Sequence, residues 1–409
     1  MRILWVKAGK LLPVDTGGKI RSYNILKHLA HTHAVTFLSY YGGQPDPDYQ
    51  SAIAQELPGD HTIYTAAPGD SALMQSLDYL RHMFQPAPFA VSKFTHAEVK
   101  RTLTSWLLDN KFDVAVCDFL SASRNFPHSH TVPCVLFQHN VETALWRRLA
   151  STESNPVRRL AYKIEALKMA RYETAALSRF PQVIAVSDHD REQMLQMSPG
   201  CAITVVPTGV DTRRFAVAQH AEAQPPKIVF TGSMDWEPNI DAVSYFCREI
   251  LPQVRAEFPS VVFQIVGRNP HAKVKRLASD SVHVTGTVPS VADYLRDSTV
   301  VVVPLRIGGG TRLKIFEAMA MGKALVSTSI GAEGLQVQSG RDLLLADAPA
   351  AFADAVVLLL RNTELRRKYE QAAVKTAAQH DWSQIAERFA SVLEIAVHNC
   401  NPSAAPIRS

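Results

Sequence analysis

Short runs of valine, isoleucine and leucine recur along this chain, and longer segments of helical period separate them. Parallel strands covered by helices on both sides have this pattern, because both faces of each strand must be apolar. The pattern therefore predicts an α/β fold built from doubly wound parallel sheets. Strands are expected near residues 3–6, 35–40, 61–65, 113–118, 134–139, 183–187, 203–207, 227–231, 261–267, 282–286, 300–305, 324–328 and 343–346.

The length of 409 residues exceeds what one hydrophobic core usually organises, which predicts two domains. A stretch of alanine, glutamine and proline, Phe215 to Pro226, has little to bury and interrupts the series of strands. We therefore expect an N-terminal domain over residues 1–212, a linker over 213–226 and a C-terminal domain over 227–378. Apolar side chains at spacings of three and four then predict an amphipathic helix over residues 379–399. These side chains are Trp382, Ile385, Phe389 and Val392.

The composition excludes several classes of protein. With 46% hydrophobic residues and a formal charge of only +5, the chain gives no reason to expect nucleic acid binding. The cysteines form no C-x-x-C pair, which argues against a disulfide framework and a zinc site. They are Cys117, Cys134, Cys201, Cys247 and Cys400. No apolar run approaches the roughly 18 residues that cross a bilayer, and residues 1–7 do not resemble an export signal. We expect a cytoplasmic protein that works in solution or at the inner face of the membrane.

The most informative segment runs from Val300 to Gly322. An apolar strand leads into the glycines 308–310, and a helical pattern then opens with Thr311, Arg312 and Lys314. Glycines let backbone N–H groups approach an anion, and the start of a helix adds a partial positive charge. Arg312 can hold phosphate oxygens in a planar fork while Lys314 adds a mobile charge, so the segment suits a diphosphate.

Glu317 lies three residues after Lys314, on nearly the same helix face. Its carboxylate can accept hydrogen bonds from the vicinal hydroxyls of a ribose, and a diphosphate joined to a ribose is a nucleotide. The alternative is a flexible glycine loop followed by a surface ion pair. The order of strand, glycines and charged residues favours the nucleotide.

Two features of the N-terminal half could face the same ligand. Gly17 and Gly18 follow the first strand, where they form either a phosphate-sized nest or a plain turn. His139 ends an apolar strand, where α/β folds place ligand-facing groups, although a polar cap of the strand is the alternative. A histidine there could bind a sugar hydroxyl or help position a leaving phosphate.

Between Arg147 and Arg171 there are seven basic and two acidic residues. On a helix, Leu160, Ile164 and Leu167 form one apolar stripe with basic residues on both sides, which suits contact with an anionic membrane. The other interpretation, a helix packed on the core with a solvated basic face, is the one that we prefer from the sequence.

The second half of the chain resembles the donor-binding half of retaining glycosyltransferases of the GT-B fold, of the large family-four type. Residues 230–239, 265–270, 286–290 and 314–328 carry the resemblance, and residues 13–23, 138–142 and 205–211 extend it more weakly. The resemblance implies two Rossmann-like domains that face each other across a cleft, with the domain over residues 1–212 on the acceptor side and the domain over 227–378 binding the nucleotide sugar. It implies a hexosyltransferase-like enzyme that moves a sugar from a nucleoside diphosphate sugar to a saccharide or lipid-linked acceptor, in polysaccharide or glycolipid biosynthesis. No cofactor or obligatory metal is expected.

The resemblance also assigns expected roles. Glu317 would bind the ribose, backbone amides near Arg312 the phosphates, and the backbone around Val288 the base. The helix over residues 379–399 would pack back on the N-terminal domain. The candidate catalytic residues are His139, Arg312 and Lys314, and the candidate donor-binding residues are Gly17, Gly18, Gly232, Arg268, Val288, Gly309, Gly310, Thr311 and Glu317.

The sequence departs from the family pattern at two places. Many relatives carry two glutamates eight positions apart, and the first of them falls here on Gly309, so a carboxylate contact to the donor sugar is missing. Relatives also often have basic residues in the loop that corresponds to Ser233–Asn239, which has none. We expect Arg312, Lys314 and Arg268 to supply that charge.

Two other functions are compatible with the same motifs. A nucleotide-sugar epimerase of the same fold would use the same phosphate site. A sugar-nucleotide-binding partner subunit without turnover would explain the missing glutamate, although the presence of Arg312, Lys314 and Glu317 argues against it.

Overall fold

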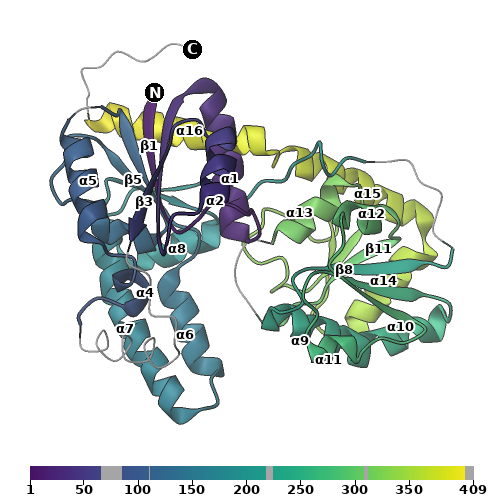
Figure 1. Cartoon of the computed structure of the whole chain (residues 1–409). Coiled ribbons are helices and arrows are strands. Elements are labelled where there is room, and N and C mark those ends of the chain that lie inside the picture. The colour runs from purple at the N-terminus through teal and green to yellow at the C-terminus, as the bar shows by residue number, and fades with distance from the viewer. Residues whose placement is uncertain (66–84, 110, 218–223, 308–311, 401–409) are drawn as a thin grey trace. The chain divides into compact units, whose positions relative to one another are not determined.

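The computed structural model describes the chain except for residues 66–84, 110, 218–223, 308–311 and 401–409 (Figure 1). It divides into two units. Unit 1 comprises Met1–Pro207 with Ile385–Ser409, and unit 2 comprises Thr208–Gln384.

Unit 1 is built on a parallel sheet of seven strands in the order β3-β2-β1-β4-β5-β6-β7. The order reverses between β1 and β4: β2 and β3 extend the sheet on the side of β1, and β5, β6 and β7 extend it on the side of β4. The strands are β1 (Arg2–Ala8), β2 (Ala34–Gly42), β3 (Asp60–Thr65), β4 (Val114–Asp118), β5 (Cys134–Phe137), β6 (Gln182–Ala185) and β7 (Ile203–Val205).

Helices cover the sheet of unit 1 because its central strands are apolar on both faces; all of β4 is buried. The helices are α1 (Gly17–Thr32), α2 (Pro47–Glu56), α4 (Phe89–Ser92), α5 (Ala97–Leu108), η1 (Leu120–Asn125), α6 (Glu142–Thr152), α7 (Pro156–Arg179) and α8 (Asp188–Met197). Three of the described helices of this unit, α2, α7 and α8, begin at a residue whose side chain caps the first turn. Asn155, for example, accepts hydrogen bonds from the N–H groups of Val157 and Arg158, and Pro156 occupies the first turn.

Unit 2 contains a parallel sheet of six strands in the order β10-β9-β8-β11-β12-β13, which reverses between β8 and β11. Its strands are β8 (Lys227–Thr231), β9 (Val262–Val266), β10 (Val282–Gly286), β11 (Val300–Val303), β12 (Leu325–Ser327) and β13 (Leu344–Leu345). Its helices are α9 (Glu237–Tyr245), η2 (Phe246–Ile250), α10 (Leu251–Glu257), α11 (Ala272–Lys275), α12 (Val291–Arg296), α13 (Leu313–Ala320), α14 (Pro349–Arg361) and α15 (Thr363–Ala378).

The prediction of two doubly wound Rossmann-like sheets is confirmed, and every expected strand coincides with an observed one. The division between the units differs from the expected end of the first domain at residue 212. The N–H group of Val210 donates to the carbonyl of His380, and Thr212 donates to the carboxylate of Asp381. Phe215, within the expected linker over 213–226, is buried in the core of unit 2.

The last helix, α16 (Trp382–Cys400), contains the division between the units. Trp382 is buried in unit 2, where a Cβ added at Gly209 would lie 2.5 Å from its ring. Phe389 lies in unit 1, with its ring centroid 5.2 Å from that of Trp5 and 5.0 Å from that of Phe137. The apolar stripe read from the sequence is therefore divided, with Trp382 in unit 2 and Ile385, Phe389 and Val392 in unit 1.

Candidate active site

The sheet of unit 2 places its charged candidate residues at one edge. The loop after β8 contains Gly232, and α13 with Lys314 follows β11. Because β8 and β11 are neighbours at which the strand order reverses, their carboxyl ends border the crevice where open α/β sheets bind ligands.

Lys314 lies against the loop after β8. Its Nζ donates a hydrogen bond of 2.9 Å to the Oδ1 of Asn239 and lies 4.0 Å from the ring centroid of Phe230. A Cβ added at Gly232 would come within 2.9 Å of this Nζ and within 2.8 Å of the amide of Asn239. The absence of a side chain at position 232 therefore lets the ammonium group approach the backbone.

Arg268, which follows β9, reaches the same loop. Its Nε donates to the Oγ of Ser233 over 2.9 Å, and its carbonyl accepts the N–H of Met234 over 2.9 Å. Lys314 and Arg268 thus bring to the segment Ser233–Asn239 the positive charge that its own sequence lacks.

Burial dominates the electrostatics of the charged residues on α13, a helix whose apolar side chains are buried. Burial lowers the pKa of Lys314 to about 7, and the neighbouring charge of Arg312 acts in the same direction, while Glu317 opposes them. Burial raises the pKa of Glu317, against the effect of the positive Arg214 and Lys314. An anion bound beside Lys314 would favour its charged form, so the site gains most from a negatively charged ligand.

Arg312, at the N-terminal end of α13, is only 5% exposed. Its Nη2 donates to the carbonyl of Ile330 over 2.9 Å and lies 3.8 Å from the carboxylate of Glu333. The guanidinium therefore holds the loop after β12, and its expected contact with phosphate stays a prediction. Val288 follows β10 and packs half-buried against the core of unit 2. Gly309, Gly310 and Thr311 lie outside the described residues.

In unit 1, a buried carboxylate at the end of β4 joins several elements. Asp118 accepts hydrogen bonds from Trp5 Nε1 (3.0 Å), Lys7 Nζ (2.9 Å) and Ser22 Oγ (2.7 Å). Its other oxygen lies 2.7 Å from the Nε2 of His139. Burial alone would raise the pKa of Asp118, but the charge of Lys7 and the hydrogen bonds from His139 and Ser22 hold it well below its ordinary range.

His139 is 2% exposed, and both of its ring nitrogens have partners. The Nη1 of Arg21 lies 2.9 Å from Nδ1; because arginine only donates, Nδ1 accepts, and Nε2 carries the proton that goes to Asp118. Burial lowers the pKa of His139 to about 3, with Arg21 and Lys7 contributing in the same direction, so the ring is neutral. The sugar contact expected for His139 stays a prediction, since in this structure the ring serves the protein's own network.

Phe119 connects this network to the start of α1. Its ring stacks on His139 with centroids 3.7 Å apart, and a Cβ at Gly18 would lie 2.5 Å from its Cζ. Its backbone has φ 72° and ψ 151°, a region that is essentially reserved for glycine. Gly17 is the first residue of α1, whose first turn contains no acidic side chain. Gly18 is thus required for packing on Phe119, whether or not its loop also meets a phosphate.

Sequence reasoning missed the supporting residues Asn239 and Asp118. Asp118 is the last residue of a buried strand. A polar residue at the end of an apolar strand is the signal that singled out His139, so the same signal could have found Asp118. Asn239 gave no such signal, because its role depends on Lys314, 75 residues away in the sequence.

Within the described residues, no group of three or more His, Cys, Asp or Glu side chains could hold a metal ion. Among the helices of the described part of the chain, none is both long and apolar enough to cross a membrane.

Two family models match the chain. Residues 225–362 match the family described as glycosyl transferases group 1, and residues 17–214 match the one described as glycosyltransferase family 4. A phosphatidyl-myo-inositol mannosyltransferase of Mycobacterium tuberculosis is 30% identical over 226 residues, which cover 52% of this chain and 58% of that protein. The match thus spans little more than half the length of this relative.

Solved structures match over nearly the whole chain. Sucrose-phosphate synthase of Thermosynechococcus elongatus is 17% identical, with a TM-score of 0.67 over 96% of this chain and 98% of its own. Anabaena Alr3699/HepE in complex with UDP and glucose is 14% identical, with a TM-score of 0.64 over 96% of this chain and 99% of its own. At these identities the likeness shows the fold alone, and that fold is GT-B.

Proposed function

We propose, since the chain belongs to the glycosyl transferases group 1 family, that it moves a sugar from a nucleoside diphosphate sugar to a saccharide or lipid-linked saccharide acceptor. One observation carries the proposal. Lys314 lies beside the glycine backbone at position 232 and donates to Asn239, at the strand reversal of unit 2. This arrangement suits the diphosphate of a sugar nucleotide.

Catalysis would rest on electrostatic stabilisation of the departing diphosphate. Charge develops on the diphosphate as the bond to the sugar breaks, and Lys314, Arg268 and the backbone amides at the start of α13 offset it. Glu317 would accept hydrogen bonds from the ribose. His139, whose nitrogens both bond within unit 1, would hold Phe119 and Asp118 in position. Retention at the anomeric carbon and independence from metal remain part of the proposal.

Relatives support the choice of substrates. One similar structure was solved with UDP and glucose, and the mannosyltransferase relative is named for a phosphatidylinositol, which is a lipid. We therefore extend the proposal to a uridine or similar diphosphate donor and to an acceptor in polysaccharide or glycolipid biosynthesis.

A membrane contact is part of the proposal, and the pair α6 and α7 carries it. The two helices run side by side in unit 1 (Figure 1). Leu160 and Leu167 are 60% and 64% exposed and Val157 is 76% exposed, so this stripe does not pack on the core. The helix α7 does pack on the core, as the interpretation that we preferred from the sequence expects, but through Met169, Ala176 and Leu177. Exposed basic residues interleave with the exposed stripe: Arg147, Arg158, Arg159 and Lys163. Apolar side chains among cations suit the inner, anionic face of a membrane.

Sedimentation with vesicles tests this contact. Phosphatidylglycerol vesicles should bind the chain and phosphatidylcholine vesicles should not, and changing Arg158, Arg159 and Lys163 to Gln should remove the binding. Lys168 is left unchanged because it pairs with Glu165 over 3.1 Å. The control changes Lys100 and Lys111 of the same unit to Gln. Binding that does not depend on lipid charge, or that persists after these three changes, would show that the face does not meet a membrane.

A thermal-shift screen of the full chain against nucleoside diphosphate sugars tests the transferase proposal, because a bound ligand raises the melting temperature. One donor should raise it, and Lys314→Ala should remove that shift. No shift with any donor would contradict the proposal. Conversion of the donor sugar to an epimer without acceptor would identify an epimerase instead.

A further inference from the structure

Unit 2 contains a pocket at the amino edge of its sheet. The pocket has a volume of about 590 Å³, which suits a small molecule, and it lies beside Val282, the first residue of β10. The strands of this sheet are parallel, so the start of β10 and the end of β11, which leads toward Lys314, lie at opposite edges. We call it the arginine pocket, because Arg248, Arg255 and Arg276 line it. It is separate from the site proposed for the donor.

One wall of the arginine pocket is a face of the helices η2 and α10. The lining residues recur there at intervals of four; they are Cys247, Leu251 and Arg255, and Arg248, Pro252 and Ala256. The helix η2 is a π-helix, in which the N–H of Leu251 donates to the carbonyl of Phe246, five residues earlier. Pro252, which has no N–H group to continue an α-helical ladder, follows this wider turn. The wider turn keeps residues four apart on one face, and π turns of this kind recur at functional sites.

The three guanidinium groups are available to a ligand. Arg255 donates through Nε and Nη2 to the carbonyl of Pro259, over 3.4 Å and 3.1 Å, which holds the group in place without balancing its charge. The side chains of Arg248 and Arg276 have no hydrogen bond or ion pair with any other residue that the structure describes. All three arginines are exposed. An anion could therefore bind here without breaking an existing ion pair.

Acidic side chains in the described part of the chain do not balance these arginines. Among the described residues that line the pocket, none is acidic. Glu249 and Asp280 are next to lining residues in the sequence but do not line the pocket. Glu257, at the end of α10, pairs instead with Arg361 over 2.5 Å. Three like charges in one pocket repel one another, and a bound anion would replace this repulsion with attraction.

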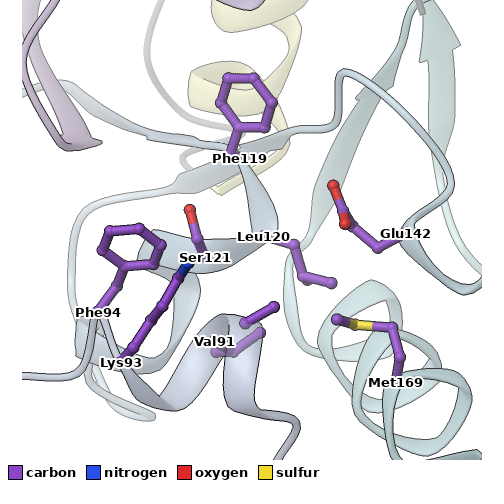
Figure 2. Close-up of a pocket in the computed structure, with 9 residues that line it drawn as sticks. Val91, Lys93, Phe94, Phe119, Leu120, Ser121, Glu142 and Met169 are labelled. Carbon is purple, nitrogen blue, oxygen red and sulfur yellow. The ribbon is translucent and has the colours of Figure 1, made fainter. Parts of the chain in front are cut away.

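The pocket of unit 1 that Figure 2 shows has a different pattern of charge. It has a volume of about 210 Å³, and Lys93 and Glu142 both line it. Burial raises the pKa of Glu142 to about 7, Glu173 acts in the same direction, and the positive charge of Lys93 opposes them. Positive and negative groups thus occur together in that pocket, whereas the charged groups that line the arginine pocket are all positive.

The rest of the arginine pocket combines apolar side chains with two hydroxyl groups. Its aliphatic side chains are Leu251, Ala256, Leu277 and Val282. Burial raises the pKa of the Cys247 thiol to about 12, so this side chain stays neutral. Ser279 and Ser281, whose Oγ atoms are 3.4 Å apart, add hydroxyl groups. The pocket therefore suits a ligand that has an uncharged ring as well as anionic groups.

We propose that the arginine pocket binds a phosphorylated small molecule of the size of a nucleotide. Its phosphate oxygens meet Arg248, Arg255 and Arg276, because planar guanidinium groups bind phosphate through paired N–H donors. A phosphate chain has enough oxygens to meet three such groups, and the uncharged ring lies over the aliphatic side chains. This site is additional to the proposed transferase function and does not depend on it.

Calorimetric titration tests the inference in the full chain carrying Lys314→Ala, in which diphosphate binding at the donor site should be weakened. The probes are ADP, GDP, CDP, UDP and glucose 1,6-bisphosphate, and each is compared with its unphosphorylated counterpart, a nucleoside or glucose. At least one probe should bind as one molecule per chain. It should bind about tenfold or more tightly than its counterpart, because each guanidinium group adds a charge-assisted contact.

Variants of the arginines locate the bound probe. Adding Arg248→Gln and Arg276→Gln to the Lys314→Ala chain should weaken binding about tenfold or more, since two charge-assisted contacts are lost. Arg367→Gln, which changes an exposed arginine of α15 outside the pocket, is the matched control and should leave the affinity unchanged. Absence of binding for every probe, or an affinity that the two arginine changes do not alter, would overturn the inference. An equal loss in Arg367→Gln would also overturn it.

The donor separates this inference from the proposed transferase function. In the chain with Lys314 intact, the two arginine changes should not alter the rise in melting temperature that a nucleoside diphosphate sugar produces. If they remove that rise, the arginines serve the donor and the inference is wrong. If soluble probes fail while phosphatidylglycerol vesicles bind the chain through these arginines, the pocket faces a lipid surface and the inference is again wrong. If no donor stabilises the wild type while a probe binds through the arginines, the transferase proposal fails and the arginine pocket stands.

Discussion

At the scale of single residues, Lys314 is the most informative position. Removing its ammonium group deletes a charge-assisted contact worth about 1.5 to 3 kcal/mol, so Lys314→Ala should weaken binding of the nucleoside diphosphate sugar roughly tenfold to a hundredfold. Calorimetry measures this directly. Lys275→Ala, an exposed lysine of the same unit, is the matched control. Unchanged affinity in Lys314→Ala would show that the diphosphate lies elsewhere.

The pH dependence of donor binding follows from the same side chain. In the free protein the pKa of Lys314 is lowered to about 7, and a bound diphosphate must raise it because the anion favours the charged form. Affinity should therefore be highest below pH 7 and fall as the pH rises through that value. A nucleoside diphosphate sugar is the suitable probe, since its diphosphate charge is constant in this range. Lys314→Arg, which stays charged, should flatten the profile; a fall that persists in this variant would assign the titration to another group.

At the scale of elements, Glu173 of α7 shows how one buried carboxylate places a functional helix. It accepts hydrogen bonds from the N–H groups of Glu142 and Thr143 and from the amide of Gln138. Glu173→Gln keeps the shape but replaces two acceptor oxygens with one, which should cost about 1 to 3 kcal/mol. Denaturant unfolding measures this loss. Glu394→Gln, on α16, is the control, and equal stability of both variants would mean that the start of α6 does not depend on this cap.

At the scale of the whole molecule, α16 should stabilise unit 1 without being needed for donor binding. Phe389 packs between Trp5 and Phe137, so Phe389→Ala removes a fully buried ring and should cost about 3 to 5 kcal/mol. The unfolding midpoint of unit 1 should fall while affinity for the nucleoside diphosphate is retained. Ile395→Ala, at a half-exposed position of the same helix, should have little effect. Loss of nucleotide binding in folded Phe389→Ala protein would show that unit 2 depends on this contact.

The sequence by itself determined the elements and the order in which they occur. Strands that are buried on both faces must be apolar throughout, so the residues that form each strand could be read from the sequence. The charged residues of α13 stood out because a helix that starts after a strand is a known anion site. The family resemblance supplied the class of enzyme.

Tertiary structure decided which residues meet. The approach of Lys314 to Asn239, 75 residues away, and the four donors around Asp118 depend on how the strands are ordered in each sheet, which local periodicity does not encode. The same holds for the end of unit 1, because Val210 joins unit 2 through a hydrogen bond to His380. It holds also for Leu160 and Leu167, since a helical stripe has the same period whether it faces a core or stays exposed.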